Sequence, residues 1–174
     1  IHPELMVQMA EESIHSPQLM QAICLNIGLL PGDSSSISAE MIEESCRFTC
    51  MNLPYADVVR VLKAGPPTRG QKRLQYLLSD GTKKDIYSLI LKVLADNPPL
   101  IKLGLEELME RIRNNVSGNM VKMQKVKDSL KSWKKILEQQ GSLYHVFDWK
   151  DDTLYVLDNM FLFYIRWGIC QEVS

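Results

Sequence analysis

Lysines are the residues of this chain whose type and spacing most clearly suggest chemistry. Within residues 121–140 they recur three or four positions apart, and one more follows at a polar turn. The set is Lys122, Lys125, Lys127, Lys131, Lys134, Lys135 and Lys150. On a helix, such spacings spread side chains over one broad solvent face. Ammonium groups on that face could contact the phosphates of duplex DNA, while polar neighbours such as Gln124 and Ser129 contact base edges. The alternative is that the lysines only keep an amphipathic helix soluble.

The distribution of charge along the chain supports a binding role for this segment. The net charge of the 174 residues is −1, but residues 1–57 contain eight acids and one base, a balance of −7. Residues 111–135 contain eight bases and one acid, a balance of +7. Opposed charge within one chain indicates a surface for nucleic acid or for an acidic partner in the second part.

Catalytic constellations are not apparent in the sequence. The three histidines are His2, His15 and His145, and none stands beside a cysteine, serine or carboxylate at a spacing typical of a nucleophile and its base. Several aspartates fall between residues 148 and 158, where a turn already explains them, and a divalent metal site needs convergent oxygens. We therefore expect no catalytic residue, no metal site and no cofactor in these 174 residues.

The four cysteines are Cys24, Cys46, Cys50 and Cys170. Cys46 and Cys50 are four residues apart, but no further Cys or His pair nearby completes a four-ligand metal site. We expect buried, reduced thiols, because free cysteine packs as a small hydrophobe. Reduced thiols suggest the cytoplasm, and no apolar run approaches the ~18–20 residues that a membrane span needs, so no membrane partner is expected.

The elements that would position the lysines follow from apolar spacing. Residues 1–64 predict four helices, over residues 3–13, 17–28, 38–50 and 55–63, and Ser16 and Ser38 are suitable helix caps. Hydrophobic residues make up 45% of the chain, enough for a packed core. The first 64 residues should therefore form a helical bundle.

Residues 65–80 differ sharply in composition from what precedes them. The stretch from Ala64 to Arg73 holds two prolines, two glycines and several bases, so it is predicted to be a linker or an exposed loop. A basic, glycine-containing loop could contact phosphate, but the Gly-Lys-Ser/Thr ending of a Walker A loop is missing. The apolar run from Leu74 to Leu78 fits either a strand or a helix.

Residues 81–174 show the order of a winged helix–turn–helix domain. Helices are predicted over residues 84–96 and 104–114, followed by the lysine-rich helix at 121–140. Two alternating runs, residues 143–149 and 153–157, flank the turn Lys150-Asp151-Asp152 and predict a β-hairpin wing, and residues 158–167 predict a closing helix. The sequence thus predicts a mainly α fold, with a helical bundle followed by a winged helix–turn–helix domain and a small β-hairpin wing.

Two separated stretches resemble one family. Residues 12–24, Glu-Ser-Ile-His-Ser-Pro-Gln-Leu-Met-Gln-Ala-Ile-Cys, resemble the start of the helical lid of AAA-type ATPases. Trp149 and the run 154–167, Leu-Tyr-Val-Leu-Asp-Asn-Met-Phe-Leu-Phe-Tyr-Ile-Arg-Trp, resemble the close of the winged helix in prokaryotic AAA-type ATPases, although Asn159-Met160 replaces the commoner Asp-Pro. The resemblance covers a lid from residue 1 to about 64 and a winged helix from about 80 to the end.

This resemblance implies an ATPase core, a lid and a winged helix in that order. ATP and Mg would belong to the core, and this chain contains neither a Walker A nor a Walker B motif. Because the chain begins with Ile1, we expect a fragment of a longer protein. The resemblance and the missing core imply that it is a C-terminal fragment that neither binds nor hydrolyses ATP alone, with ATP hydrolysis confined to the full-length protein. Many lids place an arginine near the Ser-Pro turn to sense the γ-phosphate. His15 and Gln18 are the candidates here, and neither supplies that charge.

Three functions remain open from the sequence. The winged helix of an ATPase fragment could contact double-stranded DNA through the lysines. It could instead be a protein–protein module that docks on the ATPase core, on a partner subunit or on a second copy of the chain. A free-standing winged-helix transcription regulator is the third possibility.

Overall fold

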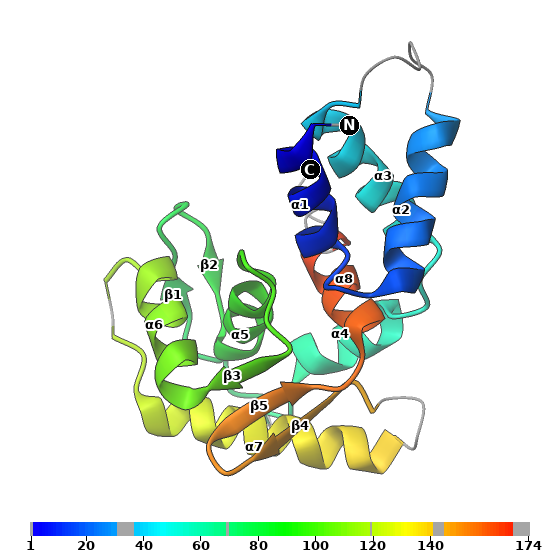
Figure 1. Cartoon of the computed structure of the whole chain (residues 1–174). Helices are drawn as coiled ribbons and strands as arrows, with labels where there is room; N and C mark the ends of the chain where they lie inside the picture. The colour runs from blue at the N-terminus through cyan, green and yellow to red at the C-terminus, as the bar shows by residue number, and fades with distance from the viewer. Residues whose placement is uncertain (1, 31–36, 69, 119, 141–144, 169–174) are drawn as a thin grey trace.

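The computed structural model describes residues 2–30, 37–68, 70–118, 120–140 and 145–168. In this part of the chain the fold is mainly helical, with two small antiparallel sheets (Figure 1). The elements are, in order, α1 (Pro3–Glu12), α2 (Pro17–Leu29), α3 (Ala39–Met51), α4 (Ala56–Ala64), β1 (Tyr76–Leu77), β2 (Lys83–Lys84), α5 (Ile86–Leu94), β3 (Lys102–Gly104), α6 (Leu105–Asn115), α7 (Met123–Gln140), β4 (Phe147–Lys150), β5 (Thr153–Val156) and α8 (Asn159–Trp167).

Side-chain caps fix where several helices begin. The Ser16 hydroxyl accepts a hydrogen bond from the Leu19 backbone N–H at the start of α2, and Ser38 caps α3 in the same way. Such caps contribute roughly 1 kcal/mol each, since they satisfy an N–H that has no partner within the helix. The two serine caps predicted from the sequence are confirmed.

The second half of the described chain builds a three-stranded sheet beside three helices. The strand order is β3-β5-β4 and every pairing is antiparallel, with Leu154 of β5 opposite Leu103 on one side and Trp149 on the other. β4 and β5 are joined through Asp151 and Asp152, whose φ angles are both positive, at 50° and 54°. Two positive φ angles match the tight two-residue turn that suits the twist of a hairpin.

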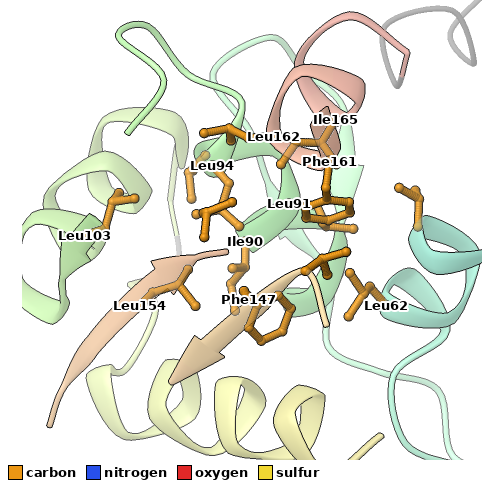
Figure 2. Close-up of a cluster of buried hydrophobic side chains, with 14 of the residues drawn as sticks. Leu62, Ile90, Leu91, Leu94, Leu103, Phe147, Leu154, Phe161, Leu162 and Ile165 are labelled. Carbon is orange, nitrogen blue, oxygen red and sulfur yellow. The ribbon is translucent and has the colours of Figure 1, made fainter. Parts of the chain in front are cut away.

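Trp133 is the centre of the packing around α7. Its ring is fully buried, with centroid separations of 6.0 Å from Tyr87 of α5 and 5.4 Å from Phe147 of β4. Its indole N–H donates to the Leu62 carbonyl at the end of α4, at 2.8 Å. Figure 2 shows the neighbouring cluster, in which Leu62, Phe147 and Leu154 converge with side chains of α5 and α8. One aromatic side chain of α7 thus contacts α4, α5 and the sheet.

The last helix, α8, packs on both halves of the molecule. It contacts α3 and α5, and Figure 1 shows it next to the N-terminal helices rather than beside α7. Asp158 caps α8 and accepts a hydrogen bond from the Tyr55 hydroxyl at 2.5 Å. Asn159 donates to the Ile14 carbonyl, and Arg166 forms an ion pair with Glu12. The C-terminal helix is thus part of the packing of residues 1–64.

The shortest strands, β1 to β3, are the elements that differ from the expectation or were left open by it. The sequence predicted a helix that begins at Lys84, but Lys84 pairs with Tyr76 in the β1–β2 ladder. The helix α5 begins after it, because the Asp85 side chain caps α5 by accepting a hydrogen bond from the Ser88 backbone N–H. The strand β3 was not predicted. The apolar run from Leu74 to Leu78 fitted either a strand or a helix, and its residue Leu77 belongs to strand β1.

The expectation of buried thiols is correct for two cysteines and wrong for a third. Cys46 and Cys50 are buried, and burial raises the pKa of the Cys50 thiol to about 12 and raises that of Cys46 as well. Cys24 is exposed, because it lies on the outer side of α2, and Cys170 lies outside the described residues.

Within the described ranges, no helix combines the length and the apolar character needed to cross a membrane.

Candidate functional site

The surface of α7 that faces away from the core carries much of the predicted lysine set. The buried stripe of this helix, Val126, Ser129, Leu130, Trp133 and Leu137, faces the interior. Lys131 and Lys135 are exposed. They follow Val126 and Leu130 by five residues each, a separation that puts them on the opposite side of a helix with 3.6 residues per turn.

Two lysines of the set are bound to the β4–β5 hairpin. Lys127 contacts the Asp152 carboxylate at 2.5 Å, and Lys134 contacts the Asp148 carboxylate at 2.6 Å. The hydrogen bond from Lys134 lowers the pKa of Asp148, and the same bond raises the pKa of Lys134. These two lysines fix the position of the hairpin against α7, so their charges are already matched.

A hollow of about 550 Å³ separates the outer side of α7 from the hairpin. We call it the helix–hairpin hollow; it is lined by Lys131, Lys134, Lys135, Glu138, Trp149, Lys150, Asp151 and Asp152. Lys131, Lys135 and Lys150 are exposed here, and no ion pair involves them within the described part of the chain. Three flexible ammonium groups in one hollow could bind phosphate oxygens as point charges.

Lys122 and Lys125 belong to a different hollow, of about 720 Å³, at the start of α7. We call it the loop hollow; it is lined by residues 66–68, 71–74 and 76, by Ile86 and Tyr87 of α5, and by Met120, Lys122 and Lys125. The seven candidate lysines are therefore divided among hairpin contacts, the helix–hairpin hollow and the loop hollow. Leu74 was expected only as part of a strand or a helix, and Met120 was given no role, because an apolar residue in the sequence does not show that it will lie exposed beside a hollow.

The predicted linker is an ordered wall of the loop hollow over most of its length. Arg73 donates to the Pro66 carbonyl, forms an ion pair with Asp85 at 3.1 Å, and lies over the ring of Tyr87 at 4.8 Å from its centroid. Residues 66–75, apart from residue 69, form no helix or strand, as predicted from composition.

The two candidates for nucleotide sensing lie apart from the lysines. His15 and Gln18 are exposed, at the connection between α1 and α2 and at the start of α2, and Figure 1 shows α4 between this connection and α7. Ile14 and His15 both have a φ of 52°. A positive φ is unusual for a β-branched residue such as Ile14, so this turn is strained.

The remaining residues considered for chemistry stay dispersed. His145 and His2 are exposed, and His2 is 3.7 Å from Glu4. In the ranges that the structure describes, no three His, Cys, Asp or Glu side chains come together as a metal-binding group.

Comparison of the chain with protein-family models, with curated proteins and with solved structures finds no match in any of the three.

Proposed function

We propose that residues 81–168 form a winged helix–turn–helix domain. The element order α5-β3-α6-α7-β4-β5 and the strand order β3-β5-β4 support this assignment. In it, α6 and α7 are the two helices of the motif, and the β4–β5 hairpin is the wing. With residues 1–64 as its lid, the chain is the C-terminal part of an AAA-type ATPase, in which ATP and Mg bind a core that these residues do not supply.

We further propose that the helix–hairpin hollow binds the backbone of duplex DNA. The observation that carries this proposal is the grouping of Lys131, Lys135 and Lys150, all exposed and all beside one hollow. An α-helix fits the major groove, and lysines at its outer side reach the phosphates along the edge of the groove.

The acids near these lysines limit the strength of the interaction. Asp152 is bound by Lys127, but Glu138 and Asp151 also line the hollow and repel phosphate. Three cations are therefore the effective contact set. Binding should be largely independent of sequence, with a dissociation constant in the range of about 10⁻⁴ to 10⁻⁶ M that is typical of backbone contacts alone.

Fluorescence anisotropy with a labelled duplex at two salt concentrations tests this proposal. Each phosphate contact contributes about −0.9 to the slope of log affinity against log salt, so three contacts predict a loss of about 40-fold from ~50 to ~200 mM salt. Absence of binding at the lower salt concentration, or an affinity that does not change with salt, would exclude the proposal.

A further inference from the structure

The loop hollow, of about 720 Å³, carries charge of one sign among its described lining residues. The charged residues that line it are Lys72, Arg73, Lys122 and Lys125, with no acid among the described lining residues. Arg73 is neutralised by Asp85, whereas the three lysines are exposed. In a chain with a net charge of −1, this concentration of positive charge favours an anionic ligand.

The hollow also has an apolar component. Leu74 and Met120 at its rim are 61% and 80% exposed, and Tyr76, Ile86 and Tyr87 form its buried floor. Large exposed apolar side chains gathered at one concave, polar-rimmed site are typical of binding surfaces. Methionine adapts readily to the shape of a partner. A ligand for this site should therefore bring an apolar group as well as negative charge.

The wall opposite α7 is held in place from within the fold. Arg73 anchors it to Pro66 and Asp85, and Gly65 begins it with a φ of 55°. A Cβ on Gly65 would stand 2.7 Å from ring atoms of Tyr87, so the chain passes close to the tyrosine ring. Of the two basic residues that the structure describes in this wall, Arg73 makes the anchoring contacts with Pro66 and Asp85, whereas Lys72 is exposed to solvent.

The buried aromatic rings argue against single-stranded nucleic acid as the ligand. Tyr76 and Tyr87 are each only 4% exposed, so their faces are not accessible for stacking on bases. The accessible apolar groups include Leu74 and Met120, with the ring of Pro67 also exposed in the lining, and none of these is aromatic. We propose that the loop hollow docks a peptide segment of a partner protein, with an aliphatic side chain against Leu74 and Met120 and carboxylates on Lys72, Lys122 and Lys125.

A synthetic peptide tests the proposal directly. The probe is a rhodamine-labelled peptide with two central leucines flanked by glutamates, titrated with the full chain by anisotropy at about 150 mM salt. Lys122→Glu with Lys125→Glu should weaken binding about tenfold or more, because like charges then face each other. Leu74→Ser with Met120→Ser should weaken it about tenfold through loss of the apolar contact. All four positions are exposed, so the variants should fold, and circular dichroism checks this.

Lys131→Glu with Lys135→Glu is the matched control on the same helix. Lys131 lies six residues beyond Lys125, about 9 Å along the axis, and such charges are largely screened at this salt concentration. The control should change peptide affinity by less than about twofold.

The proposal is overturned if the peptide does not bind, if the control weakens binding as much as the hollow variants, or if a peptide with serines in place of the leucines binds equally well. Loss of duplex-DNA binding in the hollow variants with unchanged peptide binding would assign the hollow to nucleic acid instead.

Discussion

At the scale of single residues, the lysines of α7 and Arg166 of α8 differ in their contacts because their partners are distant in the sequence. Lys127 and Lys134 are bound to aspartates of the hairpin, whereas Lys131, in the same helix, is exposed. Arg166 of α8 donates two hydrogen bonds to Glu12 of α1, each 2.6 Å long, and a third to the Ala95 carbonyl after α5. One guanidinium therefore joins three segments of the chain.

Glu12→Gln should lower the free energy of unfolding by about 3 kcal/mol, because it removes a buried carboxylate that accepts two charge-assisted hydrogen bonds from Arg166. The side chains of this pair are only 9% and 14% exposed, so water cannot take over the role of the carboxylate. Urea denaturation measures the effect. As a control, Asp57→Asn removes a carboxylate of an exposed pair with Arg60 and should cost less than about 0.5 kcal/mol. Equal effects of the two substitutions would contradict this role for the buried pair.

Ser45→Ala should raise the free energy of unfolding by about 1 kcal/mol. The Ser45 hydroxyl is buried inside α3 and has no hydrogen-bond partner among the described residues, so its removal relieves a desolvation cost. Alanine is also the better helix former. Ser129 of α7 is a matched control, because its buried hydroxyl donates to the Lys125 carbonyl at 2.8 Å and its removal should give no gain. Thermal unfolding of both variants checks the difference, and a destabilised Ser45→Ala would refute it.

At the scale of elements, the long periodic segments were predictable and the short ones were not. α7 occupies residues 123–140 against a predicted 121–140, because a full amphipathic stripe, Val126 to Leu137, specifies it. β3 has three residues and a single buried side chain, Leu103, so its sequence holds too little alternation to be recognised. β3 forms because the neighbouring strand β5 supplies its backbone hydrogen bonds. The local sequence of β3 does not show that this partner will lie beside it.

The contact between α7 and the hairpin should depend on pH through Asp148. The pKa of this carboxyl is lowered by its hydrogen bond from Lys134, so its stabilising effect is present above the unfolded-state pKa of about 3.9 and is lost as the pH falls through the lower folded value. Asp148 is partly exposed, and the effect should be about 0.5 kcal/mol. Thermal unfolding of wild type and Asp148→Asn should therefore differ at pH 7 and converge only as the pH falls from about 4 through the lowered folded-state pKa of Asp148. A constant difference across this range would contradict the assignment.

At the scale of the whole molecule, α8 links the helices of residues 1–64 with the second half. Its aromatic sequence was recognisable, and Phe161 and Phe163 are fully buried as a closing helix requires. Its neighbours were not predictable, because Tyr55, Glu12 and Ile14 are more than 100 residues away along the chain. The candidate site also depends on contacts between distant segments. The spacing of the lysines predicted that they lie on one helix, but only the fold shows which of them line a hollow together with Lys150.

The most direct test of the account is the salt dependence of duplex-DNA binding in a variant without Lys131, Lys135 and Lys150. Replacement of all three by alanine should reduce the magnitude of the slope of log affinity against log salt by about 2.7, since each lysine contributes about 0.9. Lys83→Ala, on the exposed strand β2 far from α7 in Figure 1, is the control and should leave the slope unchanged. A triple variant with the wild-type slope and affinity would contradict the proposal that α7 and its hairpin bind DNA.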